Sequence, residues 1–303
     1  MSQWQKGEAN TLLGYPADAR LLIINADDFG MCHAINAAIL RALKAGVVCS
    51  TTLMAPCPWA LHAMQLLGEQ PDIPFGVHLT LISDTANYRW GPLTSRDKAT
   101  SLVDESGYFY LSGSIPEFLA RAKLEEVEAE FRAQIETVLA AKLTPTHLDW
   151  HCLHMGGRPD IFDMTLGLAK EYGLALRVYE RTLVDKMQRL GLPTSDHDLL
   201  DSFRLDTAGK SARYAQLLRD LPVGLSEWAV HPGLADGELL AIHPDGARVR
   251  QTDFDFMVSD GARAIIQQED ITLLSYRPLQ EVWRERYTFT SSSPFPIAAP
   301  PRR

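Results

Sequence analysis

Two adjacent carboxylates, Asp27 and Asp28, follow the aliphatic run at residues 21–24 and precede Gly30. Such a run is typical of a strand that is buried on both faces of a parallel sheet. The pair would therefore lie at the carboxyl end of a strand, where parallel α/β proteins build their active sites. There, one carboxylate can hold a cation while its neighbour takes a proton. Alternatively, one of them caps the helix that begins near Met31, although a cap needs only one Asp.

Three histidines occupy the same position within their own segments. His78, His151 and His231 each lie at or near the end of a stretch that predicts a strand, at residues 75–80, 146–151 and 226–231. Because the carboxyl ends of parallel strands share one rim, residues far apart in the sequence meet there. One carboxylate and two imidazoles suit Zn²⁺ or another divalent ion with open positions. The remaining Asp and His would serve as base and acid in hydrolysis of a carbonyl derivative.

Taken singly, a histidine at a strand end is more often structural, and only the coincidence of three indicates a site. Near His151, Asp149 could orient a ligating imidazole, and a softer metal site that uses Cys152 stays open. Arg277 ends the last predicted strand and would either hold a carboxylate at the rim or point to solvent. The other histidines lack strand-end positions, and we expect surface or loop locations for His33, His62, His197 and His243.

Helical and strand-like segments alternate at short intervals along the chain. Strands are predicted at 21–24, 47–54, 75–80, 146–151, 174–179, 226–231 and 271–277, and helices at 34–44, 59–67, 116–142, 161–172, 214–221 and 254–268. This alternation is typical of a parallel sheet or barrel. Residues 82–116 lack periodicity and leave the His78 strand, so we expect a loop that faces substrate. Residues 181–211 are predicted to be mostly loop with short helical pieces.

We find no internal repeat and no clear linker. The predicted organisation is a lead-in at 1–20, one domain at 21–290 and a Pro- and Ser-rich tail at 291–303. The net charge of −9 argues against nucleic acid as the main partner. No apolar run approaches the roughly 20 residues that span a bilayer, and residues 1–20 lack the apolar core of a secretory signal. The four cysteines form no CxxC pair, which favours a reducing cytoplasm.

Several motifs together resemble those of the YdjC/ChbG-like carbohydrate deacetylases (ChbG/HpnK type). They are NADDFG at residues 25–30, GVHLT at 76–80, PTHLD at 145–149 with His151, HPG at 231–233 and SYR at 275–277. The resemblance runs from about residue 21 to residue 278, with the motifs in the family's order. NADDFG is the most specific of them, and HPG alone would be weak.

This resemblance implies a distorted (β/α) TIM-like barrel that uses a divalent metal ion, zinc or magnesium. The implied reaction is hydrolysis of the N-acetyl group of an amino sugar or chito-oligosaccharide. Matched position by position, Asp28, His78 and His151 correspond to the metal ligands, Asp27 to the general base and His231 to the general acid. Members of the family are often homodimers.

The sugar itself is less well defined by the sequence. Many relatives carry a longer histidine-rich run after HLD, whereas this chain has His151-Cys152-Leu153-His154, so the substrate stays open. We expect Trp150, His154 and Arg277 to contact the sugar, and the other candidates for stacking on it are Trp90, Tyr108 and Trp228. Two alternatives remain: a divalent-metal hydrolase of another amide or ester, and a carbohydrate-binding relative without catalysis. A pure binder needs neither the Asp27 base nor the His231 acid.

Overall fold

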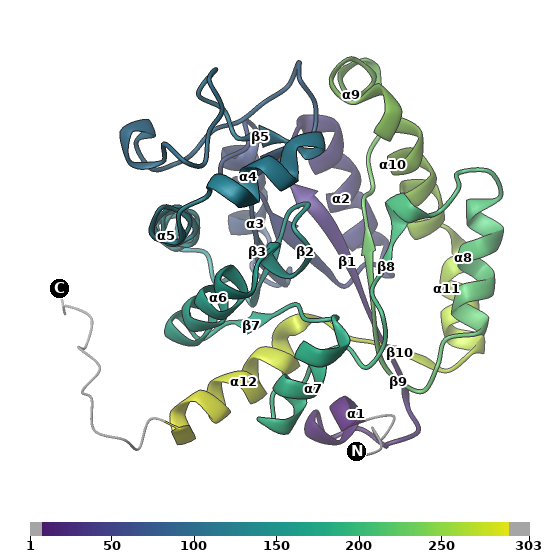
Figure 1. Ribbon diagram of the computed structural model, residues 1–303. Helices are drawn as coiled ribbons and strands as arrows, with labels where there is room; N and C mark the ends of the chain where they lie inside the picture. Colours follow the sequence, from purple (N-terminus) through teal and green to yellow (C-terminus); the bar gives the residue numbers. More distant parts are fainter. Residues whose placement is uncertain (1–7, 291–303) are drawn as a thin grey trace.

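Strand β1 (Arg20–Phe29) lies at the centre of an all-parallel sheet in the computed structural model, which describes residues 8–290 (Figure 1). All of its residues after Arg20 are buried, as the aliphatic run predicts. The sheet has the order β7-β6-β3-β2-β1-β9-β8, and β10 pairs with β1 beside this path. The other strands are β2 (Ser50–Leu53), β3 (Phe75–Leu79), β6 (His147–Trp150), β7 (Ala175–Leu176), β8 (Leu200–Asp201), β9 (Gly224–Val230) and β10 (Ile271–Leu273).

Helices surround the curled sheet and complete a distorted (β/α) TIM-like barrel, which confirms the expected architecture (Figure 1). Within residues 8–290, β7 and β8 end the sheet without pairing to each other, so the barrel is open there. The longer helices are α2 (His33–Ala45), α3 (Ala60–Glu69), α5 (Leu124–Ala140), α6 (Pro159–Tyr172), α7 (Arg181–Arg189), α8 (Lys210–Arg219), α10 (Pro244–Met257), α11 (Asp260–Gln268) and α12 (Tyr276–Thr290). Three shorter helices are α1 (Glu8–Leu12), α4 (Ile115–Arg121) and α9 (Gly237–Ile242).

The strand register places the candidate residues at one end of the sheet. The pairing of β1 with β9 ends at Ala26 opposite Val230, so Asp27 and His231 both follow the last paired residues. In the pairing of β3 with β6, His78 lies opposite Asp149. Parallel strands in this register bring their carboxyl-terminal residues to a common rim.

Two segments, each of which we predicted to form a single helix, are each divided between two helices in the structure. The single helix expected at 116–142 is α4 followed by α5, because the Lys123 backbone is extended and its N–H donates to the Ser101 hydroxyl rather than to a helix carbonyl. The helix expected at 254–268 covers the end of α10 and the whole of α11. Ser259 is extended between them and caps α11 by accepting from the Ala262 N–H.

Two segments that we expected to be irregular contain regular elements. The described part of the 1–20 lead-in contains α1, whose buried Asn10 donates to the carbonyls of Pro16 and Ala19. Residues 181–211 contain the nine-residue helix α7, in accord with the helical pieces predicted there, and the edge strand β8, which was not predicted. The predicted tail, residues 291–303, lies outside the described residues.

The stretch at 82–116 is largely irregular, as predicted, but it is packed against the domain. Two-residue strands β4 (Ile82–Ser83) and β5 (Tyr110–Leu111) pair within it. The buried Glu130 carboxylate of α5 accepts hydrogen bonds from the backbone N–H groups of Leu93 and Thr94, which fastens the stretch to the helix. Its position beside the rim is therefore set by hydrogen bonds to a buried carboxylate.

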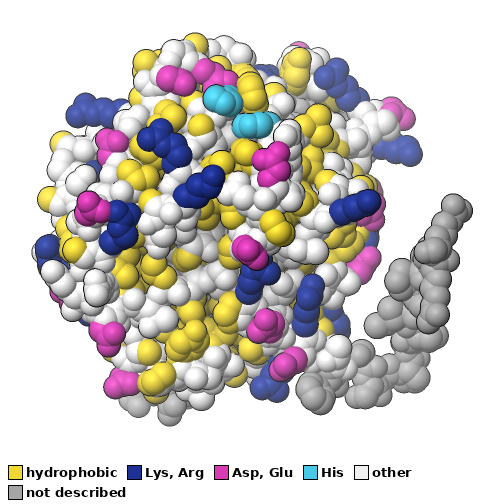
Figure 2. All heavy atoms as spheres, turned by 180° about the vertical axis from the view of Figure 1, so that it is seen from behind, with side chains coloured by type: hydrophobic (Ala, Val, Ile, Leu, Met, Phe, Trp, Pro, Cys, Tyr) yellow, Lys and Arg dark blue, Asp and Glu magenta, His cyan; other side chains and the backbone are white. Residues whose placement is uncertain are grey.

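The surface carries charges of both signs. Seen from behind, Lys and Arg side chains are interspersed with Asp and Glu (Figure 2). No helix within residues 8–290 has the length and apolar character that crossing a bilayer requires.

Candidate active site

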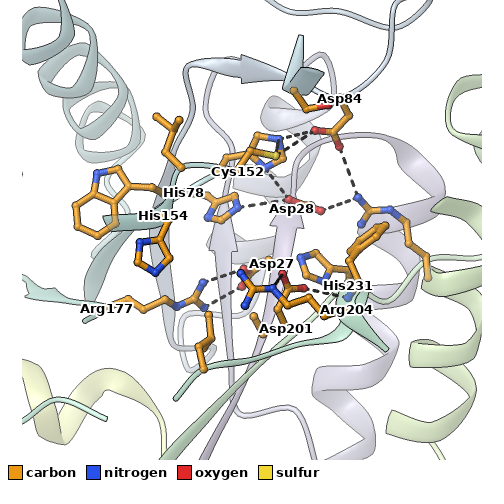
Figure 3. Close-up of a pocket in the computed structure, with 18 of the residues that line it drawn as sticks. Asp27, Asp28, His78, Asp84, Cys152, His154, Arg177, Asp201, Arg204 and His231 are labelled. Atoms are coloured by element: carbon orange, nitrogen blue, oxygen red, sulfur yellow. Dashed lines mark hydrogen bonds and ion pairs between the residues drawn. The ribbon is translucent and has the colours of Figure 1, made fainter. Parts of the chain in front are cut away.

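Asp28, His78 and His151 converge on one point at the rim. The Asp28 Oδ1 atom lies 3.4 Å from His78 Nε2 (Figure 3). The same oxygen lies 3.2 Å from His151 Nδ1, and all three side chains are buried. Asp28 Oδ1 is a buried oxygen without a well-formed hydrogen bond. Ligand atoms about 2.1 Å from a tetrahedral ion lie about 3.4 Å apart, so the two measured distances fit a shared cation. The donor atoms of the three residues also lie within 4.8 Å of one another.

The backbone around Asp28 explains how two adjacent residues face the same cavity. Neighbours on a regular strand point to opposite faces of the sheet. Here the pairing of β1 with β2 shifts register between Ala26 and Phe29, and Asp28 has a φ of 74° in the left-handed region. Such irregularities re-aim side chains beside active sites. Neither aspartate caps α2, whose N-cap is Cys32 without a side-chain hydrogen bond, so the capping alternative is wrong.

Each of the two imidazoles contacts a second carboxylate through the ring nitrogen that does not face Asp28. His78 Nδ1 lies 2.7 Å from Asp149 Oδ1, and His151 Nε2 lies 2.7 Å from Asp84 Oδ1. In each case the other ring nitrogen faces Asp28, the arrangement that fixes the tautomer and orientation of a metal-ligating histidine. Burial alone would lower the pKa of His78, but the Asp149 carboxylate outweighs it and raises this pKa to about 9. Asp149 thus has the orienting position that the sequence suggested.

Arg250 of α10 binds the other oxygen of Asp28. Its Nη2 donates to Asp28 Oδ2 at 2.7 Å, and the guanidinium is buried. Burial alone would raise the pKa of Asp28, but the charge of Arg250 holds it well below its usual range. Because Arg250 occupies Oδ2, Oδ1 remains turned toward the two imidazoles.

Asp27 is held by Arg177, which follows β7. The guanidinium donates to both Asp27 oxygens, at 2.8 and 2.9 Å (Figure 3). Its Nε donates to Glu227 Oε1 at 2.8 Å. The same guanidinium lies 2.7 Å from Asp149 Oδ2. Burial would raise the pKa of Asp27, but the Arg177 charge and hydrogen bonds lower it far below its usual range. Asp27 is therefore ionised at neutral pH.

His231 lies across the same cavity at the end of β9. Its backbone N–H donates to the buried Asp253 at 2.8 Å, and its Nδ1 lies 2.7 Å from the Ser202 hydroxyl. The ring of Phe203 packs edge-on against it, with centroids 4.7 Å apart. With Nδ1 engaged by Ser202, Nε2 is the ring nitrogen that a substrate could reach.

These groups surround a cavity of about 340 Å³, within the range of small-ligand sites. All five predicted catalytic and metal-binding residues line it, together with the expected sugar contacts Trp150 and His154. Asp84 and Ser112, from the stretch at 82–116, line it as well, in accord with the expected substrate-facing position.

Arg277 lies elsewhere: the expectation that it faces the rim and contacts the sugar is wrong, and the alternative, an Arg exposed to solvent, is confirmed. Strand β10 pairs with Arg20–Leu22, the first residues of β1, so it ends well before the rim. Arg277 is exposed near the start of α12 and donates to the carbonyls of Pro71 and Asp72, which precede β3. It therefore belongs to the amino end of the sheet.

Of the other aromatic and histidine residues considered in the sequence analysis, some line the cavity and others lie elsewhere in the molecule. His243, for which we expected a surface or loop location, lies between α9 and α10 beside Phe203 and also lines the cavity. Trp90 and Trp228 are buried in the core, where Trp228 stacks on Tyr214. Tyr108 lies beside two arginines outside the cavity lining.

Comparison with known proteins identifies the family. The model of the family described as "YdjC-like protein" matches residues 21–268. The chain belongs to this family. Among curated relatives, a carbohydrate deacetylase of Thermoanaerobacter pseudethanolicus is 30% identical over 263 residues, which are 86% of this chain and 100% of the relative. A carbohydrate deacetylase of Enterococcus faecalis is 33% identical over 85% of this chain and 97% of the relative.

A solved structure agrees with this assignment. A crystal structure from Enterococcus faecalis, described as that of a cellobiose-phosphate cleavage protein, is 31% identical and superimposes with a TM-score of 0.74. The match covers 86% of this chain and 99% of that protein. The YdjC-like fold thus accounts for nearly the whole described domain.

In this YdjC-like chain, sequence reasoning missed the three charged residues Asp84, Arg177 and Arg250. Arg177 carried a signal, because a charged residue within the apolar run at 174–179 must find a buried partner. Glu227 within the apolar run of β9 carried the same signal, and the two are indeed paired. Asp84 lies in an irregular stretch and Arg250 on a helix far along the chain, so neither had a local pattern to mark it.

Proposed function

We propose that this protein is a metal-dependent hydrolase that removes the N-acetyl group from an amino sugar or chito-oligosaccharide. The observation that carries the proposal is the position of Asp28 Oδ1, a buried oxygen facing His78 Nε2 and His151 Nδ1. The same cavity is lined by Asp27 and His231, which can act as base and acid. The names of the relatives, carbohydrate deacetylases, support a sugar as the acetylated substrate.

Asp28, His78 and His151 would hold the cation. Two imidazole nitrogens and one carboxylate favour zinc over magnesium, which prefers oxygen ligands throughout. When bound, the ion would supply Lewis acidity that polarises the acetyl carbonyl and acidifies water. Asp84 and Asp149 keep the two imidazoles in the required orientation.

Asp27 and His231 would move the protons of the reaction. Asp27 is ionised because Arg177 stabilises its charge, so it can accept a proton from the attacking water. His231 would donate from Nε2 to the departing amine, since Nδ1 is engaged by Ser202. The two groups line one cavity, so both can reach a bound acetamide.

Acetate release from N-acetylglucosamine and its oligomers tests the proposal. We expect turnover by the zinc-loaded protein, loss of turnover with a chelator and recovery when zinc is returned. Asp27→Asn should lower kcat by about 10³-fold while zinc remains bound, because only proton transfer is removed. Substantial activity of Asp27→Asn would disprove the base assignment.

The same assay separates the alternatives. Release of acid from other amides or esters, without acetate from amino sugars, would identify a hydrolase of a different bond. Sugar binding with no turnover of any substrate would identify a non-catalytic relative. The homodimer that the resemblance implies stays a prediction, which light scattering after size-exclusion chromatography tests.

A further inference from the structure

A buried network formed by Ser202, Tyr214 and Asp253 lies beside His231 without lining the cavity. Its three side chains are fully buried and come from different elements. Ser202 follows β8, Tyr214 is on α8 and Asp253 is on α10. Because buried polar groups are costly to leave unpaired, the partners of each member indicate what the network does.

The network ends at Asp253, whose two oxygens have different partners. Oδ2 accepts from the His231 backbone N–H at 2.8 Å, and Oδ1 accepts from the Tyr214 hydroxyl at 2.9 Å. The ammonium group of the buried Lys210 lies 2.5 Å from Oδ1 and balances the charge of the carboxylate. Asp253 thus holds the main chain at His231 and offers only acceptors to its neighbours.

The donors and acceptors available in the network give its hydrogen bonds one direction. A carboxylate only accepts, so Tyr214 donates its single hydrogen to Asp253 and its own oxygen can only accept. Burial and Asp253 raise the pKa of Tyr214, whereas a hydrogen bond from Ser202 lowers it, as a donor to the phenol oxygen does. The Ser202 hydrogen is therefore directed to Tyr214. The Ser202 oxygen, 2.7 Å from His231 Nδ1, must then accept from this nitrogen.

We propose that Ser202, Tyr214 and Asp253 are positioning residues that keep a proton on Nδ1 of His231. This inference rests on the proposed function, in which His231 is the acid. As the C–N bond of the acetamide breaks, the Nε2 proton passes to the departing nitrogen while Nδ1 keeps its own. If the Ser202 hydroxyl were free to turn, it could donate to Nδ1 instead. A ring that accepts there cannot be doubly protonated, which is the form that the acid needs.

Nitrogen NMR of the zinc-loaded protein measures the tautomer and needs no turnover. The two ring nitrogens of a neutral histidine differ in chemical shift, and a His231→Gln variant assigns the signal. At a pH where this ring is neutral, we expect the wild-type proton on Nδ1. Tyr214→Phe keeps the ring that stacks on Trp228 but frees the Ser202 hydrogen. A population with the proton on Nε2 should therefore appear in this variant.

The dependence on the leaving group tests whether the network serves the acid. Acetate release from N-acetylglucosamine oligomers requires protonation of the amine, whereas 4-nitrophenyl acetate expels a stable phenolate without it. Ser202→Ala and Tyr214→Phe should each lower kcat on the amide about 3- to 10-fold and leave ester hydrolysis unchanged. The matched control is Tyr172→Phe, which removes a hydroxyl that donates to Glu136 outside the cavity lining. It should change neither rate nor the tautomer.

Thermal unfolding shows that each variant is folded. A wild-type proton on Nε2, or a tautomer that Tyr214→Phe does not change, would overturn the inference. Unchanged amide turnover in both variants, or equal losses on amide and ester, would overturn it as well. If the tautomer depends on Tyr214 as expected but the wild-type protein releases no acetate, the positioning network stands and the proposed reaction fails.

Discussion

Arg177 binds both oxygens of Asp27, with N–O distances of 2.8 and 2.9 Å, although 149 residues separate them along the chain. The same guanidinium contacts Asp149 and Glu227. It therefore joins the proposed base to the carboxylate that orients His78. The proposed base and the proposed metal ligand His78 therefore both depend on the buried guanidinium of Arg177.

Replacing Arg177 with Lys should lower kcat about 10- to 100-fold. Lysine keeps the positive charge but cannot donate to two carboxylate oxygens at once, so Asp27 would lose its fixed orientation. Steady-state kinetics of acetate release measure the effect. The matched control is Arg132→Lys, a partly exposed pair with Glu128 and Glu171, which should leave kcat unchanged. An unchanged kcat in Arg177→Lys would show that the paired hydrogen bonds from the Arg177 guanidinium do not position Asp27.

Asp149→Asn should weaken zinc binding about 10- to 100-fold. Asn keeps the shape of the side chain but removes the charge that orients and strengthens the His78 imidazole. Competition with a zinc chelator measures the affinity. Asp163→Asn, at an exposed pair with Lys186, provides the control and should bind zinc like the parent. Equal affinities in the two variants would exclude an orienting role for Asp149.

Zinc affinity should rise with pH between 7 and 9. Asp149 and Asp28 raise the pKa of His78 to about 9 in the metal-free protein, so its ring is protonated at neutral pH. A ligating imidazole must be neutral, and zinc binding therefore releases this proton. Titration calorimetry in buffers with different ionisation enthalpies counts the released protons. A zinc affinity that is constant between pH 7 and 9 would contradict the protonation of His78.

Gly76→Ala should destabilise the fold by about 1–3 kcal/mol. A Cβ at position 76 would lie 2.7 Å from the His147 carbonyl oxygen and equally close to its ring, so β3 and β6 would have to separate. His78 follows two residues later on β3, and zinc binding should weaken as well. Gly68→Ala, in α3 with open space around it, should be neutral or stabilising by about 1 kcal/mol. Chemical denaturation compares the free energies of unfolding of the two variants. Equal values would show that β3 and β6 have room for a Cβ at position 76.

The residues that the sequence identified share a local signature. Asp27, Asp28, His78, His151 and His231 follow or end apolar strands, and parallel pairing then brings them to one rim. The hydrophobic pattern did not predict the helix breaks at Lys123 and Ser259. At both positions the helical spacing of apolar residues continues, and the helix is interrupted by a hydrogen bond that the pattern does not contain.

Strand ends and motifs were thus enough to predict the barrel and to bring Asp28, His78 and His151, the proposed ligands, to one rim. Only the tertiary structure decided which charges surround them. Arg177, Arg250 and Asp84 reach the site across long chain separations, and such contacts leave no periodic trace in the sequence. The pairing of β10 with the first residues of β1 likewise removed Arg277 from the rim, because a strand's register, not its composition, decides where its end lies.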